Sequence, residues 1–454
     1  MPIRILGYAD LLIRYHPPLP QTDQRTDIMQ TIPALRATPL AIALSCIAFS
    51  AHATNGMNLE GYGPLAMSMG GAAMAYDSGM AAMMNNPATL ALTVPGDQLA
   101  LALHHLGPDV SVRGVADSGG DSYYMPAIGW GRKEGPLTYG VGMFAQGGMG
   151  TEYGRDSMFS MGTGENVRSE LGVGRVIFPV AYEVSPKLTV GASLDFVWAM
   201  LDVGMVASSD QVAAMGGNLG GASAAYISFS DSNDFTGKAK GYGYAGKLGL
   251  TYKVSPTLTL GAAYHSKTHL NDLKTSADGA TMTLYDGTDP IGSMSGKMTV
   301  VDFQWPETYA VGLAWQATPK LMIASDLRRV NWSDAMSKFT MSFNGTTLTM
   351  PQDWRDQTVY SLGAQYRVSD KLGVRVGVNY GKNPVPNTYL QPLFPAIVEW
   401  HYTAGFDYKV SDSGCVAFAL SYAPKVTETT DPNPYSLTIT HSQVSAMAGY
   451  NHHF

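Results

Sequence analysis

Histidine and cysteine are the residues best suited to catalysis or metal binding. This chain of 454 residues contains ten histidines and two cysteines. A lipase-like site would need a serine, a histidine and a carboxylate or carboxamide that meet at one place. The paired or terminal histidines fall near the ends of predicted strands, form no such constellation and lack a carboxylate partner for a metal: His104, His105, His441, His452 and His453. The only cysteine of the predicted mature chain is Cys415. We therefore predict no enzyme activity, no metal, no cofactor and no disulfide.

The composition indicates a membrane protein that crosses with strands. Charged residues make up 14% of the chain, well below the ~25% of a soluble domain, and there are 50 glycines. A helical membrane protein would need apolar runs of about 18 residues, and the mature chain has none. Low charge without such runs favours a β-barrel, whose lipid-facing side chains occupy alternate positions. The net charge of −7 argues against a nucleic-acid partner.

Strict alternation in the C-terminal half supports this interpretation. Leu372, Val374 and Val376 share one face of a predicted strand, and Gly373 and Arg375 share the other. A soluble β-sandwich also alternates, but here the second face carries glycine, serine, threonine and charges, which would make a poor core. Large apolar and aromatic residues facing lipid, with small and polar residues facing a lumen, fit a barrel instead. We predict an all-β fold, a transmembrane antiparallel β-barrel.

A recurring turn motif indicates the number of strands. It reads Val184-Ser-Pro-Lys-Leu and Val254-Ser-Pro-Thr-Leu, with looser copies at 317–321, 368–372 and 410–414. Proline and serine favour tight turns, so each copy joins two neighbouring strands, and long connections alternate with these short ones. About fourteen strands follow, one of them spanning 298–316. The short turns would be periplasmic, and the longest connections, 206–237 and 271–297, would be extracellular loops.

Three N-terminal regions precede the predicted barrel of residues 97–454. Residues 29–53 resemble a secretory signal peptide that ends at Ala51-His-Ala53, and residues 1–28 look like an upstream extension. A lipoprotein signal at Cys46 is an alternative that the apolar run beyond the cysteine disfavours. Residues 54–96 do not alternate and are rich in methionine and glycine, so we expect them to fold as a plug inside the lumen. Their methionines would contact apolar ligands or simply fill gaps.

An ordered set of short motifs resembles the FadL/TodX family of outer-membrane transporters. The matching stretches are Gly70-Gly71-Ala72, Asn85-Asn86-Pro87-Ala88, Gly107-Pro-Asp-Val110, Trp305-Pro-Glu307, Asn331-Trp-Ser333, Asn383-Pro-Val-Pro386 and the terminal Phe454. The resemblance implies a fourteen-stranded barrel in the outer membrane of a Gram-negative bacterium, closed by an N-terminal hatch. Residues 54–96 would be that hatch, with Asn86, Pro87, Ala88, Gly70 and Gly71 as its motif residues.

The resemblance also implies passive uptake of hydrophobic compounds. The ligand would bind, the hatch would rearrange, and the ligand would leave sideways through the barrel wall at Gly147, Gly148 and Gly150. These glycines interrupt a strand ladder or are ordinary strand-end residues. Long-chain fatty acids are the first expectation, with aromatic or aliphatic hydrocarbons as the alternative. A general porin is a third class, which the plug-like segment disfavours.

The expected ligand contacts and partners complete this prediction. Lys338, Arg328 and Arg329 are candidates for binding a carboxylate, although arginine at a strand end is often an interface anchor. Met200 is an apolar candidate. Outer-membrane lipid and lipopolysaccharide would surround a monomeric barrel, and the barrel assembly machinery would recognise Phe454 on the alternating last strand.

Overall fold

The computed structural model describes residues 55–233, 236–432 and 436–454, all within one compact unit that spans residues Phe49–Phe454. The predicted upstream extension and signal peptide, and residue 54 of the predicted hatch, lie outside the described residues. No helix in the described ranges has the length and apolar character needed to cross a membrane.

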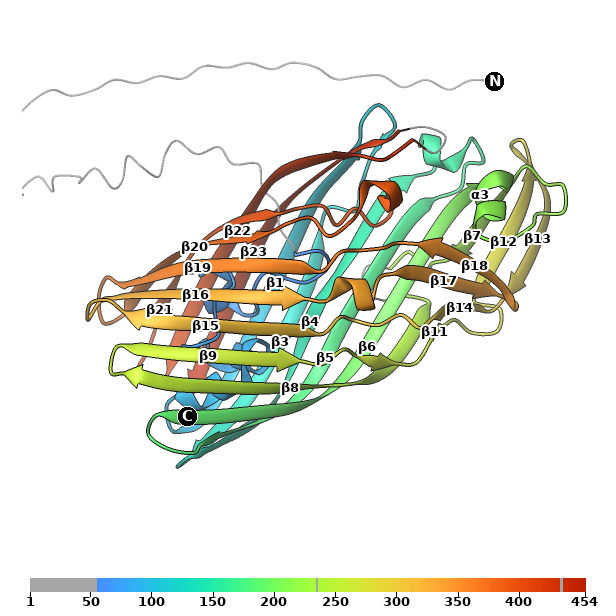
Figure 1. The fold of residues 1–454 in the computed structure, drawn as a ribbon. Coiled ribbons are helices and arrows are strands. Elements are labelled where there is room, and N and C mark those ends of the chain that lie inside the picture. Colours follow the sequence, from blue (N-terminus) through green and yellow to red (C-terminus); the bar gives the residue numbers. More distant parts are fainter. Residues whose placement is uncertain (1–54, 234–235, 433–435) are drawn as a thin grey trace, which may run out of the picture. The chain divides into compact units, whose positions relative to one another are not determined.

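Fourteen long antiparallel strands of the described residues close into a barrel (Figure 1). The first strand pairs with the second and also with the last, from Gln98 opposite His453 to Val112 opposite Ile439, and this pairing closes the ring. The predicted all-β fold and strand number are confirmed. The barrel strands are β1 Gly96–Val112, β3 Tyr123–Glu134, β4 Leu137–Gly154, β5 Val167–Glu183, β6 Leu188–Ser208, β8 Ala239–Ser255, β9 Leu258–His265, β15 Thr308–Gln316, β16 Leu321–Val330, β19 Gln357–Arg367, β20 Leu372–Gly381, β21 Trp400–Lys409, β22 Gly414–Thr429 and β23 Thr438–His453.

Alternation along each strand separates a lipid-facing surface from the lumen. In β20 the side chain of Val376 is 60% exposed, whereas its neighbour Arg375 is 3% exposed. A row of stacked or tilted aromatic rings crosses neighbouring strands on the outer face: Tyr360, Tyr380, Trp400, Tyr402 and Tyr422. Such a row matches the aromatic girdle of membrane barrels.

The two longest connections are folded rather than the loops that we predicted. β6 continues to Ser208, which caps α3 (Ser209–Ala214) with a reciprocal hydrogen bond to Gln211. β7 (Ala224–Phe229), β12 (Ala280–Asp286) and β13 (Asp289–Gly296) form a sheet that extends β6. Their inward residues Ala225, Ile227 and Phe229 are fully buried. Short alternating runs in these connections therefore form paired strands in the tertiary structure. The sequence pattern did not identify these pairings.

The predicted strand over 298–316 is wrong, because the structure divides it. β14 (Met298–Val301) pairs with β11 (Leu273–Lys274) and β17 (Lys338–Phe343), whereas β15 pairs with β9 and β16. Residues 302–307 between them are not strand. Asp302 has a positive φ of 53°, and Pro306 cannot donate to a ladder, so the chain bends there. The remaining short elements are β2 Ala116–Asp117, β10 His269–Leu270, β18 Thr346–Pro351, η3 Met158–Ser160, η4 Trp332–Asp334 and η5 Asn387–Tyr389.

Residues 55–95, called the N-terminal segment below, fold into short helical turns that contact strands around the whole barrel. Its helices are α1 Pro64–Met67, η1 Gly79–Ala81, α2 Ala82–Asn85 and η2 Pro87–Leu92. Inward-facing glycines of five strands lie against its backbone, and a Cβ on any of them would overlap it: Gly191, Gly249, Gly261, Gly363 and Gly377. Contacts on so many strands place the segment in the lumen, where the blue ribbon lies in Figure 1.

Candidate functional site

The barrel wall has a gap between β3 and β4. Their ladder runs from Glu134 opposite Leu137 to Ile128 opposite Met143 and ends there. Beyond that point β3 still pairs with β1 as far as Tyr123, and β4 still pairs with β5 as far as Gly154. The two neighbouring strands therefore diverge over their outer portions and leave the wall open.

Glycines let β4 bend away at this gap. The β4–β5 register shifts between Ala145 and Gly147, and again between Glu152 and Gly154. A Cβ on Gly147 would overlap the Met57 carbonyl, and one on Gly148 would overlap the Leu171 carbonyl. A Cβ on Gly150 would meet the Tyr123 hydroxyl. All three predicted wall glycines therefore lie at the gap, in positions where a side chain does not fit.

The N-terminal segment holds the bend from inside. The Gly148 N–H donates to the Met57 carbonyl at 3.1 Å, and Asn58 forms a β-bridge with Gly147. The Tyr62 hydroxyl donates to the Gln146 carbonyl at 2.8 Å. The start of the predicted hatch is thus hydrogen-bonded to the part of the wall that opens.

Asn58 connects this bend to the non-strand segment between β14 and β15. Its Oδ1 accepts from Gln146 Nε2 at 3.2 Å and from Trp305 Nε1 at 2.8 Å. The indole of Trp305 packs edge-to-face on Trp332, which packs in the same way on Trp354. Because all three indoles are at most 2% exposed, Asn58 sits in a rigid apolar environment.

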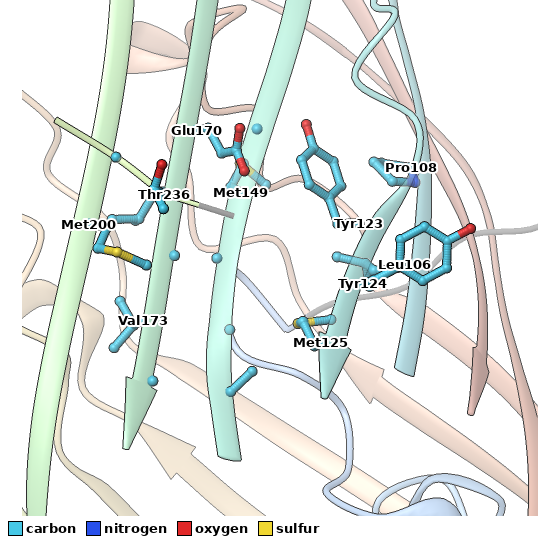
Figure 2. A pocket seen from close by; sticks show the side chains of 18 of the residues that line it. Leu106, Pro108, Tyr123, Tyr124, Met125, Met149, Glu170, Val173, Met200 and Thr236 are labelled. Carbon is cyan, nitrogen blue, oxygen red and sulfur yellow. The ribbon is translucent and has the colours of Figure 1, made fainter. Parts of the chain in front are cut away.

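A cavity of about 280 Å³ lies at the gap and passes through the wall (Figure 2). Leu106, Phe144 and Val173 line it from inside, whereas Tyr124 and Met143 belong to the outer face. Figure 2 shows Tyr123 and Tyr124 on β3, across from Met149, Glu170 and Val173 on the neighbouring strands. Most of the lining is apolar, and none of its residues is a lysine or an arginine.

The connection between β20 and β21 folds over the cavity from the loop side. The Pro392 carbonyl accepts from the Tyr153 hydroxyl at 2.7 Å, and the Leu393 carbonyl accepts from the Ser169 hydroxyl at 2.5 Å. The Pro395 carbonyl lies 2.7 Å from His441 Nδ1. Carbonyls of one connection thus bond to β4, β5 and β23, and this connection forms the roof of the cavity.

The predicted hatch motif anchors the N-terminal segment to the wall. Asn86 Nδ2 donates to the carbonyls of Met74 at 2.7 Å and Leu250 at 3.2 Å, and its Oδ1 accepts from the Ala88 N–H at 3.0 Å. Asn86 is thereby the N-cap of η2, with Pro87 in the first helical position, where its missing N–H has no consequence.

The glycine pair of the motif makes a second anchor. The Gly70 N–H donates to Thr403 Oγ1 at 2.9 Å, and its carbonyl accepts from Asn379 Nδ2 at 3.0 Å. Gly70 and Gly71 have φ of 67° and 81°, which glycine adopts without strain. Asp326 accepts from the N–H groups of Ala73 and Met74 a few residues further on.

Buried ion pairs lie on the inner wall next to the cavity. Arg175 follows the cavity-lining Gly174 on β5, and its Nη1 lies 2.9 Å from Asp195 Oδ2. Lys247 also pairs with Asp195, and all three side chains are at most 1% exposed. Burying charges is tolerated only when they are paired, so these side chains give the inner wall a polar, ion-paired patch beside the apolar cavity.

The structure does not bring the predicted cationic residues to the cavity. Lys338 is exposed on β17, and Arg329 is exposed and lies 3.0 Å from Asp356. Arg328 is half-buried on β16 and, like the other two, is absent from the lining. Met200 does line the cavity. Tyr123, Glu170 and His441 were missed, since no motif in the sequence indicates which inward or edge positions of separate strands will meet.

Phe454 lies at the seam where the barrel closes. Its side chain is 67% exposed, and its backbone N–H donates to the Asp97 carbonyl at 2.9 Å. The last residue thus extends the β1–β23 pairing by one hydrogen bond.

The match to a known family covers the described barrel except for the end of its last strand. Residues 42–448 match the family of outer membrane protein transport proteins called OMPP1/FadL/TodX. The chain belongs to this family. As a FadL/TodX protein it is a channel for hydrophobic compounds in the outer membrane, as the sequence resemblance predicted.

Solved structures of FadL/TodX proteins are similar over nearly their full length. The Pseudomonas putida toluene transporter TodX is 30% identical, covers 87% of this chain and 99% of its own, and superposes with a TM-score of 0.79. The Ralstonia pickettii toluene transporter TbuX is 33% identical over 87% of this chain and 99% of its own, with a TM-score of 0.72. The monoaromatic hydrocarbon channel CymD is 28% identical over 88% and 99%, with a TM-score of 0.70.

A curated sequence relative adds little about function. An uncharacterized protein of Chlorobium limicola is 45% identical over 97 residues, which are 21% of this chain. The match spans about half the length of that relative.

Proposed function

We propose that this channel takes up small neutral aromatic hydrocarbons passively and releases them sideways through the gap between β3 and β4. The observation that carries the proposal is the through-wall cavity, which is mostly apolar and has no lysine or arginine in its lining. A fatty-acid carboxylate in such a site would be an unpaired charge, which is costly to desolvate. Arg168 lies beside the lining residue Glu170, but its guanidinium is already engaged, at 2.9 Å from the Glu170 carboxylate and 3.8 Å from that of Asp202.

The buried ion pairs of Arg175, Asp195 and Lys247 support the sideways route. An apolar ligand gains nothing from this region, whereas the outer end of the cavity borders the lipid-facing residues Tyr124 and Met143. A path into the bilayer keeps the ligand in apolar surroundings, so the lateral route has the lower barrier. The identities near 30% to toluene transporters favour the same class of ligand.

Long-chain fatty acids remain the second candidate. Arg328 faces the lumen on β16, in the strand row of the inward residues Asp326 and Val330, so a cation is present in the barrel although outside the cavity. A fatty acid bound there would have its carboxylate away from the wall gap.

The test is to fill the outer part of the cavity without disturbing the backbone. Gly172 on β5 lines the cavity, and a Cβ added to it meets no atom within 4 Å. Gly172→Leu should lower the initial rate of labelled toluene uptake into proteoliposomes by about tenfold, which corresponds to a barrier raised by about 1.4 kcal/mol. The matched control is Gly246→Leu on β8, a position between the exposed Tyr244 and Leu248 and outside the cavity.

Two results would count against the proposal. Equal uptake by Gly172→Leu and the wild-type channel would remove the wall gap as the route. Saturable uptake of oleate with no uptake of toluene would replace the proposed ligand class with fatty acids.

A further inference from the structure

His441 is a polar group without a complete set of partners in the apolar cavity. It lies on β23, lines the cavity and is 2% exposed. Its Nδ1 is 2.7 Å from the Pro395 carbonyl oxygen, which can only accept, so Nδ1 carries the hydrogen. A buried imidazolium without a counter-charge is costly, so the ring is neutral and Nε2 presents a lone pair. Among the described residues Nε2 has no hydrogen-bond partner.

Such an unpaired acceptor calls for an explanation. Buried polar atoms in native proteins are almost always paired, and the exceptions often mark functional sites. The residues beside His441 in this part of the lining include Pro108 and Val110 of β1, which have no side-chain donor. Gln443, the next lining residue on β23, donates through Nε2 to Ser445 Oγ at 3.1 Å. A ligand with one donor would complete the pairing.

The roof of the cavity sets the orientation of the ring. Pro395 belongs to the connection between β20 and β21 that bonds to β4 and β5 through Leu393. Because Nδ1 is committed to Pro395, the opposite edge of the ring, with Nε2, is directed away from the roof carbonyl. The hydrogen bond therefore positions an acceptor and leaves no donor on the ring for a carboxylate.

We propose that His441 Nε2 accepts a hydrogen bond from the ligand, so that the cavity prefers small aromatic molecules with one hydroxyl group over aromatic molecules of the same shape without it. This inference rests on the proposed function and refines its ligand class. A phenol or aromatic alcohol supplies the missing donor and places its ring on the apolar lining. An ionised carboxylic acid has no donor to offer to Nε2.

The test compares two ligands of similar shape, p-cresol and 4-methylanisole, which differ in the hydroxyl hydrogen. Equilibrium dialysis with the purified detergent-solubilised channel should show about tenfold tighter binding of p-cresol, the effect of one hydrogen bond to a buried group. His441→Asn keeps a donor at the position of Nδ1 for Pro395 and removes the acceptor, so the preference should vanish while 4-methylanisole still binds. His441→Gln reaches the position of Nε2 with an amide oxygen and should retain the preference.

The outcomes separate this inference from the function on which it rests. If the wild-type channel binds toluene but binds p-cresol and 4-methylanisole equally, the role of His441 is refuted and the proposed function stands. An undiminished preference in His441→Asn would also refute it, since the acceptor would then lie elsewhere. If the wild-type channel binds none of the three aromatic ligands, the proposed function fails and the inference falls with it.

Discussion

The Gly148 amide donates a hydrogen bond to the carbonyl oxygen of Met57 across 3.1 Å. One residue belongs to the bent strand beside the wall gap, and the other to the segment that fills the lumen. The shape of the opening therefore depends on where the N-terminal segment lies. If Met57 moves, Gly148 loses a backbone hydrogen-bond partner, and β3 cannot replace it because β3 does not pair with β4 at that point. This link motivates the first two predictions.

Asn58→Ala should weaken the hold of the N-terminal segment on the bend. The variant removes the acceptor of Trp305 Nε1, and leaving that buried donor unpaired costs about 1–3 kcal/mol. Gln146 Nε2 loses Asn58 as well and keeps only the Tyr62 hydroxyl, at 3.3 Å. We expect a lower temperature of thermal unfolding and a higher conductance to small ions in planar bilayers.

Asn55→Ala is the matched control for this variant. Asn55 lies in the same turn and is equally buried, but its side-chain atoms have no hydrogen-bond partner among the described residues. It should leave conductance unchanged. Equal effects of the two substitutions would mean that the turn matters only through its packing.

Asn86→Asp should weaken the attachment of the hatch motif to the barrel wall, while the barrel still assembles. The carboxylate keeps the acceptor for the Ala88 N–H, but it replaces the donor that faces the carbonyls of Met74 and Leu250. Oxygen facing oxygen in a buried site should destabilise the segment by about 2–4 kcal/mol. Conductance should rise, and the mobility shift on boiling before electrophoresis should persist.

Pro87→Ala is a milder substitution in the same motif. The proline occupies the first position of η2, where it is preorganised for the helical turn, so the substitution should reduce toluene uptake without affecting assembly. A variant with wild-type uptake would show that this proline does not contribute to gating.

The cations predicted from the sequence provide a test of ligand charge. Lys338→Ala and the double variant Arg328→Ala/Arg329→Ala should leave toluene uptake within about twofold of the wild type, because exposed ion pairs such as Arg329–Asp356 contribute ~0–1 kcal/mol. The measurement is paired uptake of labelled toluene and oleate by each variant. A selective loss of oleate uptake would assign these residues to a carboxylate, and a tenfold loss of toluene uptake would contradict the neutral-ligand proposal.

Phe454 supplies a prediction about assembly. Deleting it removes the exposed terminal ring and the hydrogen bond to the Asp97 carbonyl, so less folded protein should reach the outer membrane. Phe454→Tyr keeps the aromatic ring and should assemble normally. Quantification of the heat-modifiable band in outer-membrane fractions distinguishes the two, and equal amounts would show that the terminal ring is not required.

Local patterning was enough to predict the barrel itself. In a strand that faces lipid on one side, every second residue must be apolar, as at Val374, Val376 and Val378, and tight turns must separate such runs. Both features are local, so they are visible along the sequence. The glycines at 147, 148 and 150 were predicted from the family resemblance instead, and they lie beside the wall gap.

The site depended on contacts that no local pattern encodes. The sequence indicated cations at Lys338, Arg328 and Arg329. The cavity is instead assembled from β1, β3, β4, β5, β6, β23, the connection that carries Pro395 and residues 236–237 before β8. Which of these residues meet depends on the register of strands far apart in the chain and on how a connection folds inward. The hydrogen bond that fixes the His441 ring spans 46 residues, and the one from Trp305 to Asn58 spans 247. Period-two alternation determines that a side chain faces the lumen, but only closure of the barrel determines what it faces there.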